Sequence, residues 1–384
     1  MNKFDETYIN LIKDIIENGV EKKTRSGHVK SVFVRQVRFD LKQGIPALTT
    51  KKMFTKGVIH ELLWFLNKYR NSNDSMNIHY LLRNGVHIWD GDAYRWFKEK
   101  MEKVLGNASG KDVKINYYLP LDDDEKSGKS LRFQYWLENE IYRDKPEFLL
   151  QMEKEEFLDM CLQGIDVWIL VDGELTKYRF GDLGPVYGKQ WRCFGVSGFD
   201  QINNIIKTLK KKPNDRRMLC IAYNPDQLND MALPPCHVMM QFYTRKLTKD
   251  ERVEIYKKRH EDDSEFELDD VPKYGLSCMW TQRSVDTPLG LPYNILSYSV
   301  LTYMIAELVN MVPDELIGSL GDCHIYLNQM EGIKEQLKRG GSDVYPQLII
   351  NGKHKKIEDF KFEDFEITEY YPDATIKMPL SVGP

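Results

Sequence analysis

The amino-acid sequence predicts an α+β fold in which helices and strands are mixed without a regular β-α-β alternation. Some stretches repeat apolar residues at the helical period, whereas others alternate apolar and polar residues or are rich in β-branched residues. A layered domain is therefore favoured over a doubly wound parallel sheet. The 384 residues, of which 42% are hydrophobic, are enough for a sizeable core.

The first predicted element is an N-terminal helix that ends at Gly19, a residue typical of helix C-termini. Its apolar face comprises Tyr8, Leu11, Ile12, Ile15 and Ile16. Residues 31–40 predict a strand that includes Val32, Val34 and Val37. The remaining elements are expected as helices at 55–69, 199–210 and 293–311, and as strands at 217–223 and 237–245.

Two segments differ in composition from the rest and are expected to be insertions in one domain that spans residues 1–384. The segment at about 95–180 contains a Gly/Ser/Asn stretch, an acidic run and aromatic-rich pieces. The charged segment at 257–273 interrupts a predicted hairpin.

The charge and cysteine content exclude several classes of protein. A net charge of -4 with 29% charged residues argues against a disordered chain and against a strongly basic nucleic-acid-binding protein. No apolar run approaches the roughly 20 residues of a membrane span, and the N-terminus does not resemble a signal peptide. The six cysteines lack paired spacing, which predicts no disulfide framework, no metal site and a reducing, cytoplasmic location.

Cys236 is the first candidate for chemistry, in the segment MALPPCH. Two prolines fix the backbone before it, which suits a nucleophile that must be held in one place. A buried core cysteine is the structural alternative, because cysteine is among the most buried residue types. His237 follows at the start of a predicted strand and would point to the opposite face, so it is a poor candidate for a base acting on Cys236.

Four arginines suggest a pocket for a phosphate or carboxylate group, although most arginines are solvated at the surface. Arg25 lies in KKTRSGH, Arg283 precedes Ser284, and Arg216 and Arg217 are adjacent. Adjacent residues of one strand cannot both reach one site without help. One of this pair is therefore expected to serve a neighbouring subunit.

Glu61 lies among apolar residues in VIHELLWFL, where burial would raise the pKa of its carboxyl toward the range for proton transfer. A glutamate on a helix surface is the alternative. Trp89 and Tyr187 lie in glycine-rich segments and are either ring-stacking surfaces or core anchors. His324 and Tyr326 are two residues apart, hence on one face of an extended segment, and could hydrogen-bond one sugar hydroxyl.

Together these motifs resemble the thymidylate synthase family. The resemblance rests on a dozen motifs in family order, which include TRSG, TTKK, HELLWF, GVHIWD, GDLGPVYG, NDRR, MALPPCH, QRSVD, LGLPYN, GDCHIY and FEDFEITEYYPDATIKM. It implies a twisted mixed β-sheet covered by helices, with one sheet face forming a homodimer interface. It also implies the substrates dUMP and 5,10-methylenetetrahydrofolate.

The resemblance assigns roles to individual residues. The implied catalytic residues are Cys236, which adds to C6 of the pyrimidine, and Glu61, Tyr187 and Asp286. The implied dUMP ligands are Arg25, Arg283 and Ser284 of one subunit, Arg216 and Arg217 from across the dimer, His324 and Tyr326 at the deoxyribose, and Asn294 at the base. The implied folate-binding residues are Lys51, Trp89, Asp286, Gly290 and Tyr293.

Asn294 indicates which base is bound. Its amide can donate to O4 of uracil and accept from N3–H, whereas cytosine presents the reversed pattern. The expected reaction is therefore methylation of dUMP to dTMP, with dihydrofolate as the second product.

Two alternatives stay open at this stage. A dUMP hydroxymethylase would give 5-hydroxymethyl-dUMP and tetrahydrofolate; it is suggested by Tyr293 and Tyr223 in place of the usual Phe and Trp, and by the extra Gly383 and Pro384. A catalytically silent nucleotide-binding scaffold ranks low, because it would be expected to lose Cys236 or Glu61 before the arginines.

Overall fold

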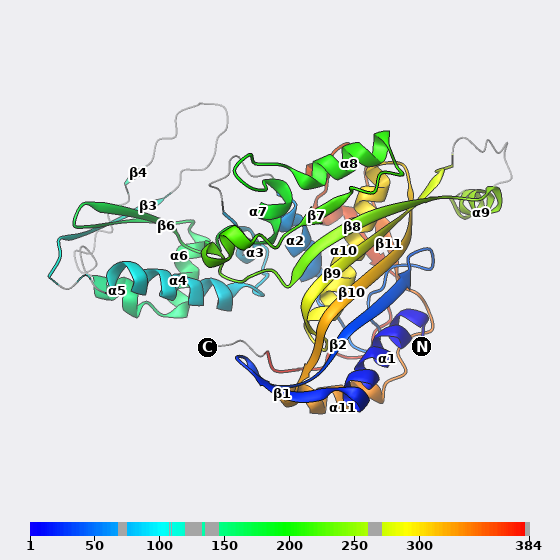
Figure 1. The fold of residues 1–384 in the computed structure, drawn as a ribbon, viewed down its shortest axis with the longest axis horizontal. Coiled ribbons are helices and arrows are strands. Elements are labelled where there is room, and N and C mark those ends of the chain that lie inside the picture. The colour runs from blue at the N-terminus through cyan, green and yellow to red at the C-terminus, as the bar shows by residue number, and fades with distance from the viewer. Residues whose placement is uncertain are drawn as a thin grey trace. The chain divides into compact units, whose positions relative to one another are not determined.

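The computed structural model describes residues 1–67, 75–106, 108, 110–119, 133–134, 146–259 and 271–380. The chain forms two compact units (Figure 1). Unit 1 comprises Met1–Lys68, Gln190–Tyr223 and Pro235–Pro384, and unit 2 comprises Tyr69–Lys189 and Asn224–Pro234. The chain thus leaves unit 1 and returns to it twice. That the chain is a single catalytic domain with two insertions stays a prediction.

Unit 1 is built on a six-stranded sheet with the order β1-β2-β10-β9-β8-β7. The strands are β1 Val20–Thr24, β2 Gly27–Asp40, β7 Leu219–Ile221, β8 His237–Lys246, β9 Tyr274–Asp286 and β10 Val312–Tyr326. Neighbouring strands are antiparallel except β9 and β10, which are parallel. The predicted α+β class with a mixed sheet is confirmed.

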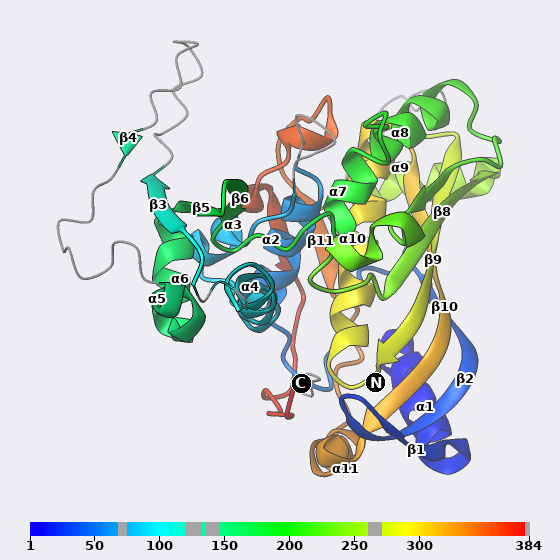
Figure 2. The ribbon, with the colours of Figure 1, turned by 60° about the vertical axis from the view of Figure 1, so that its left-hand side comes forward.

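The helix α10, Gly290–Leu308, connects the two parallel strands and packs against both of them (Figure 2). Nearly all of its residues are apolar or buried, as expected for a helix enclosed on all sides. Trp280 of β9 stacks on Tyr298 of α10 with ring centroids 5.5 Å apart. Gly318 of β10 makes room for this indole, because a Cβ at that position would come within 2.5 Å of Trp280. The face of the sheet that packs on α10 is therefore a close-packed core.

Away from α10, the sheet carries a groove of about 640 Å³ whose walls come from β2, β8, β9 and β10. Its lining includes Arg38, Met279 and Ile317, and Tyr243, whose side chain is 66% exposed. Arg245 also lines the groove, where it donates hydrogen bonds to Asp314 and Glu251. This region therefore combines exposed apolar side chains with ion pairs.

The predicted N-terminal helix is confirmed as α1, Lys3–Asn18. The Asn2 side chain caps it by accepting hydrogen bonds from the backbone N–H groups of Phe4 and Asp5, and Gly19 follows its end. The predicted helix at 199–210 is α8, Gln201–Lys211, which Asp200 caps in the same way. Local capping chemistry therefore sets these boundaries.

Three predicted elements have different bounds in the structure. The helix predicted at 293–311 begins at Gly290, because Pro292 is tolerated within the first helical turn. The helix predicted at 55–69 is α2, Thr55–Phe65. The strand predicted at 217–223 is confined to the three residues of β7, whereas that at 237–245 is confirmed as β8.

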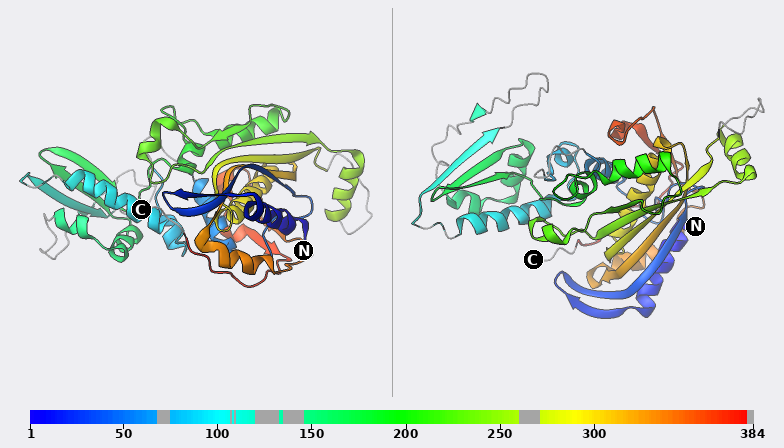
Figure 3. Two further views of the ribbon diagram at one scale, coloured as in Figure 1. Left: turned by 60° about the horizontal axis from the view of Figure 1, so that its bottom comes forward. Right: turned by 45° about the horizontal axis from the view of Figure 1, so that its top comes forward.

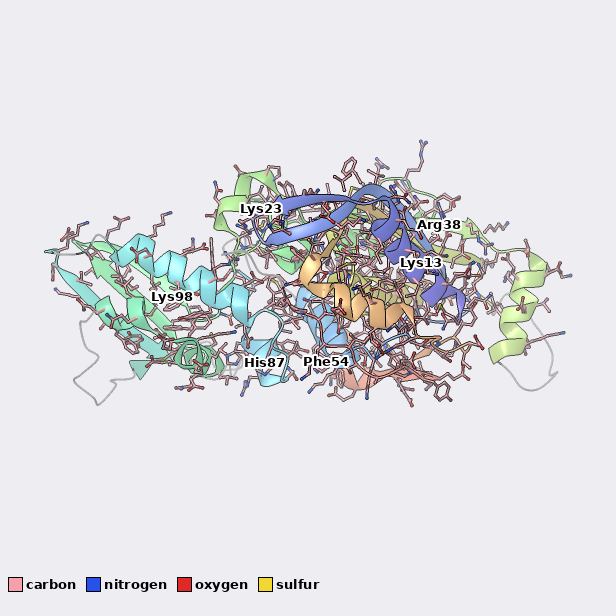
Figure 4. The ribbon with its side chains drawn as sticks, turned by 90° about the horizontal axis from the view of Figure 1, so that it is seen from below. Lys13, Lys23, Arg38, Phe54, His87 and Lys98 are labelled. Carbon is pink, nitrogen blue, oxygen red and sulfur yellow. The ribbon has the colours of Figure 1, made fainter. Side chains whose placement is uncertain are left out.

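The strand predicted at 31–40 is the second half of a longer β2, which pairs with the unpredicted β1 in a hairpin at the sheet edge (Figure 3). Lys23 of β1 and Arg38 of β2 lie toward opposite ends of this hairpin (Figure 4). Val34 departs from the predicted pattern: it is exposed and has φ of 58°, a conformation that is strained for a β-branched residue. The expected alternation is therefore broken at that point.

Unit 2 contains a four-stranded antiparallel sheet with the order β4-β3-β5-β6. Its elements are α3 His79–Arg83, α4 Asp90–Leu105, β3 Val113–Leu119, β4 Phe133–Gln134, α5 Pro146–Gln151, α6 Lys154–Leu162, β5 Asp166–Val171, β6 Glu174–Arg179 and the 3-10 helix Pro225–Asp230. Its core includes an aromatic cluster in which the ring of Phe97 contacts those of Phe157, Tyr178 and Phe180. The segment expected at about 95–180 is thus mostly ordered secondary structure where it is described.

The remaining elements are α7 Tyr187–Arg192, α9 Lys249–Arg259, α11 Met330–Leu337, β11 Gln347–Ile350, β12 Phe365–Thr368 and the 3-10 helices Leu327–Gln329, Ile357–Asp359 and Phe362–Asp364. The helix α9 follows β8 and precedes β9, which pair antiparallel, so the predicted interrupted hairpin is confirmed. Residues 260–270 of the charged segment at 257–273 lie outside the described residues, as do Gly383 and Pro384.

A buried histidine ties the C-terminal region to the end of α10. His354 contacts Glu307 through Nδ1 at 2.7 Å and Asp364 through Nε2 at 3.0 Å, and its ring stacks on Phe360. Only 5% of the His354 side chain is exposed. Burial opposes its charge, but the hydrogen bonds to Glu307 and Asp364 outweigh burial and raise the pKa of His354.

Candidate active site

The strand topology of unit 1 brings several sequence-predicted residues to one end of the six-stranded sheet. Because β9 and β10 are parallel, both end there, and Asp286 pairs with His324 across them. β8 is antiparallel to β9 and begins there, so Cys236 lies just before its first residue. Tyr326 pairs with Val29 of β2, next to the turn of the β1–β2 hairpin.

Cys236 is held in place through its backbone neighbours. Its carbonyl accepts a hydrogen bond from the backbone N–H of Arg283 at 2.9 Å, and the Arg283 side chain donates through Nε to the carbonyl of Pro235 at 3.0 Å. The other five cysteines are buried, whereas Cys236 is half-buried. Burial raises the pKa of Cys278 and of Cys323 to about 12, which suppresses their thiolates. Cys236 is thus the accessible thiol.

Tyr326 connects the nucleophile candidate with the β1–β2 hairpin. Burial raises the pKa of Tyr326, a side-chain hydrogen bond with Ser26 lowers it, and the charges of Asp286 and Cys236 raise it. The ring of Tyr326 lies edge-to-face against His324 with centroids 5.1 Å apart. The structure therefore brings the predicted His324 and Tyr326 together, near Cys236.

Asp286 ends β9 as a largely buried carboxyl group. It accepts hydrogen bonds from the backbone N–H of Leu289 at 3.1 Å and from Nε2 of Gln329 at 3.4 Å. Burial raises the pKa of Asp286, while these bonds and the nearby His324 and Lys51 lower it. A carboxyl group held in this way can accept a hydrogen bond from a ligand N–H.

Lys51 is buried beside Asp286, and its Nζ donates to the carbonyl of Pro288. Burial lowers the pKa of Lys51 to about 8, against the attraction of the Asp286 carboxylate. A folate tail that uses this ammonium group would have to draw it away from Pro288. Its assignment as a folate ligand stays a prediction.

Asn294, in the first turns of α10, is joined to the strand that carries the nucleophile candidate. Its side chain hydrogen-bonds to that of His237, whose pKa burial lowers to about 4 in spite of this bond. His237 is therefore neutral near pH 7 and can orient the Asn294 amide without adding charge. A Cβ at Gly290 would lie 3.6 Å from Asp286 Cβ and 3.9 Å from Asn294 Oδ1, which shows that these residues are neighbours.

The four predicted arginines lie in two groups. Arg25 is an exposed residue of the two-residue turn between β1 and β2, and Arg283 is an exposed residue near the end of β9, so both belong to the same end of the sheet. Ser284 follows Arg283 and is half-buried. Together they could bind an anionic group beside Cys236.

Arg216 and Arg217 lie elsewhere. The carbonyl of Arg216 accepts a hydrogen bond from Gln241, which pairs with Met279, five positions before Ser284 on β9. At the usual rise per strand residue this separation is roughly 16 Å, more than an arginine side chain can cover. The Arg217 side chain is 85% exposed and pairs with Asp215. The described chain does not bring these two arginines to the other predicted phosphate ligands.

Trp89 and Tyr187 belong to unit 2, where both are buried and their rings lie edge-to-face with centroids 6.0 Å apart. Gly184 allows the close approach that shapes this loop, because a Cβ there would lie 1.8 Å from the carbonyl oxygen of Asp230, and its φ is +73°. Glu61 is half-buried on α2 of unit 1, among buried apolar neighbours. The predicted roles of these three residues stay predictions.

The sequence analysis missed polar residues that support the site. Gln329 is fully buried; besides Asp286 it contacts the carbonyl of Pro379, and its Oε1 accepts from the backbone N–H of Tyr326. Asp322 contacts both His324 and Lys22. The sequence signal for them was position alone: Asp322 is the aspartate of GDCHIY, Gln329 follows that motif by three residues, and Lys22 precedes TRSG.

The described residues lack two further features. Among them, no group of three or more His, Cys, Asp or Glu side chains could hold a metal ion. No helix within the described ranges is long and apolar enough to cross a membrane.

Comparison with known proteins identifies the family. The family model described as thymidylate synthase matches residues 6–382. Thymidylate synthase of Candida albicans is 36% identical over 399 aligned positions, which cover 99% of this chain and 98% of that protein. The enzymes of the same name from Mycoplasma mobile and Listeria monocytogenes are 35% and 34% identical, over 98% of this chain and 100% and 99% of theirs. The chain belongs to the thymidylate synthase family of methyltransferases.

Proposed function

We propose that this protein transfers a one-carbon unit from 5,10-methylenetetrahydrofolate to C5 of dUMP and releases dTMP and dihydrofolate. The observation that supports this most directly is the half-buried thiol of Cys236 at the sheet end that also carries Asp286, His324 and Tyr326. A fixed, accessible thiol next to groups that suit a nucleotide is what covalent activation of a pyrimidine requires.

In this proposal the Cys236 thiolate forms a bond to C6 of the pyrimidine, and the electron pair of the C5–C6 double bond moves toward C5 and O4. Asn294 donates to O4 and accepts from N3–H, which favours uracil and stabilises the charge that develops on O4. Neutral His237 orients the Asn294 amide through its side-chain hydrogen bond. C5 then forms a bond to the one-carbon unit, whose bonds to the two folate nitrogens break in turn. Loss of the C5 proton, transfer of a hydride from the folate to the exocyclic carbon and departure of the Cys236 thiolate restore the C5–C6 double bond.

The folate supplies both the one-carbon unit and the hydride that reduces it. Asp286 would accept a hydrogen bond from the pterin ring, a role that its buried, hydrogen-bonded carboxyl suits. Trp89, Gly290 and Tyr293 would contact the ring, and Lys51 the tail. Glu61 and Tyr187 would move protons at O4 and C5.

We also propose a homodimer in which each site is completed by Arg216 and Arg217 of the partner. The exposed position of both arginines, roughly 16 Å from Ser284 of their own chain, supports this arrangement. The sheet face with its groove and the exposed Tyr243 provides a surface of apolar side chains and ion pairs that a second copy would cover. Arg25, Arg283 and Ser284 would bind the phosphate from within the chain.

None of the six cysteines, all of which the structure describes, forms a disulfide, which supports a reducing compartment, and we propose the cytoplasm. Cys236 therefore needs no prior reduction to act as a nucleophile.

Incubation of the protein with dUMP and 5,10-methylenetetrahydrofolate, followed by mass spectrometry of the nucleotide, tests the reaction. The expected product is dTMP, formed in equal amount to dihydrofolate, which absorbance measures in the same reaction. Cys236→Ala serves as the matched control and should give neither product. A nucleotide product that is heavier than dTMP by one oxygen, formed without dihydrofolate, would refute the methyl transfer. It would still identify dUMP as the substrate.

A further inference from the structure

The side chain of Asp322, on β10, contacts two basic side chains. Its Oδ2 forms an ion pair with Nζ of Lys22, and its Oδ1 lies 3.2 Å from Nδ1 of His324. The backbone carbonyl of Asp322 is a second acceptor for the same Nδ1, at 3.3 Å. The three side chains therefore form the chain Lys22–Asp322–His324.

These contacts decide which nitrogen of His324 carries the proton. A backbone carbonyl and a carboxylate can only accept, so Nδ1 must be the donor to both. In the neutral ring Nε2 is then an acceptor. Tyr326, whose ring contacts His324, offers a hydroxyl group as the complementary donor. An alcohol that donates to Nε2 and accepts from Tyr326 satisfies both groups.

Lys22 extends this arrangement to the phosphate end of the site. It lies on β1, three residues before Arg25, and β1 pairs with β2 alone. Lys22 pairs with Val29, and Val29 pairs with Tyr326, so the Lys22–Asp322 ion pair reaches across β2 to β10. β2 already pairs with β10, and this contact adds a direct link from β1, the outer strand of the hairpin, to the strand that carries His324.

The stability of the fold does not explain this ion pair. The side chains of Lys22 and Asp322 are 44% and 32% exposed, and surface pairs of this kind contribute little to folding. Both partners, however, lie close in sequence to residues that the proposed function assigns to dUMP, Lys22 to Arg25 and Asp322 to His324.

We propose that Asp322 and Lys22 are positioning residues of the nucleotide site. Asp322 holds His324 in the tautomer whose Nε2 accepts the hydrogen bond of the 3′-hydroxyl of dUMP, and Lys22 sets the position of Arg25 at the phosphate. The inference rests on the proposed function, in which His324 and Tyr326 bind that hydroxyl. It adds that the enzyme recognises the hydroxyl as a hydrogen-bond donor.

Isothermal titration calorimetry tests the inference by comparing the affinity for dUMP with that for 2′,3′-dideoxyuridine 5′-monophosphate, which lacks the 3′-hydroxyl. Asp322→Asn preserves size but replaces the carboxylate, which only accepts, by a neutral amide whose N–H can also face Nδ1. Only the contact with the backbone carbonyl at 3.3 Å then still favours a proton on Nδ1, so the preference for that tautomer weakens. The substitution should weaken dUMP binding by about tenfold and dideoxy-nucleotide binding by less than about twofold. Asp322→Glu should restore part of the preference for dUMP. Lys22→Met should weaken both nucleotides by a similar, smaller factor, because the phosphate is common to them.

Asp166→Asn is the matched control, since Asp166 forms a cross-strand ion pair with Arg179 in unit 2 and has similar exposure. It should change neither affinity. Nitrogen-15 NMR of labelled histidine provides a second measurement: His324 should show protonated Nδ1 in the wild type and a shift toward protonated Nε2 in Asp322→Asn.

The outcomes separate the inference from the proposed function. If the wild type prefers dUMP and Asp322→Asn weakens both nucleotides equally, the tautomer role is wrong and the function stands. An unchanged NMR tautomer in Asp322→Asn would overturn it too. If the wild type does not distinguish the nucleotides, or binds neither, the hydroxyl contact in the proposed function fails and the inference fails with it.

Discussion

Subunit mixing provides the sharpest test of the proposed shared site. The two variants are Cys236→Ala, which removes the nucleophile, and Arg216→Ala, which removes a phosphate ligand expected from the partner. Arg216 lies beside Gln241, roughly 16 Å along the sheet from the Ser284 of its own chain. If that distance excludes Arg216 from the site of its own chain, each site combines Cys236 of one chain with Arg216 of the other. In a mixed dimer, both substitutions then fall in one site and the other site has neither.

The expected magnitude follows from this geometry. Random exchange of equal amounts gives about half mixed dimers, and each of these contains one site with both lesions and one with neither. About a quarter of all sites should then be intact, and the mixture should recover about a quarter of wild-type activity. If Arg216 served its own chain, every site would carry a lesion and the recovery would be zero.

The assay measures dihydrofolate formation at a dUMP concentration at which each variant alone is nearly inactive, and native mass spectrometry follows subunit exchange. Mixing Cys236→Ala with Arg283→Ala is the matched control, because Arg283 is bonded to the backbone beside Cys236 in the same chain. That mixture should recover nothing. Recovery near zero in the first mixture, with exchange demonstrated, would refute shared sites.

Three further predictions concern single residues. Cys236→Ala should bind dUMP but form no covalent complex with 5-fluoro-dUMP and the folate, as denaturing mass spectrometry would show; an adduct in this variant contradicts the assignment. Asn294→Asp should lower kcat/KM for dUMP by at least about tenfold, since it loses a donor to O4, and should raise the relative preference for dCMP; an unchanged ratio of the two values would mean that Asn294 does not select the base. The raised pKa of His354 means that its ion pairs stabilise the fold below its unfolded pKa of about 6.5 and lose effect as pH rises through the folded value. His354→Gln should therefore reduce the free energy of unfolding by about 1 to 2 kcal/mol at pH 6 and by much less at pH 9, whereas a difference independent of pH in urea titrations would exclude this mechanism.

The sequence predicted elements whose signal is local. The apolar face of α1 and the glycine that follows its end are properties of a short segment, and the same holds for the strand β8. β1 was missed because VEKKT is a charged, exposed edge strand with no alternating pattern. The left-handed backbone at Val34 has no local signal, since β-branched residues rarely adopt that conformation.

The site residues also divide into those with a local sequence signal and those without one. The thiol of Cys236 and the pair His324 and Tyr326 could be proposed from short motifs. Lys22 and Asp322 are 300 residues apart in sequence, and only the register of three strands brings them together. Gln329 is a single polar residue, and no pattern in the sequence predicts that it is buried.

The helix α10 links the two residues proposed to bind the base and the deoxyribose, Asn294 and His324. It begins at Gly290, four residues before Asn294, and ends where the chain turns into β10, which returns along β9 to His324. A displacement of α10 along its axis would move Asn294 relative to the sheet, while His324 stays fixed by its pairing with Asp286. The close packing of Trp280 on Tyr298 over Gly318 resists such a displacement. If Asn294 and His324 bind the two ends of the nucleoside as proposed, this core packing sets the distance between them. Enlarging Gly318 should then alter substrate selection, although Gly318 is not among the residues proposed to bind the substrate.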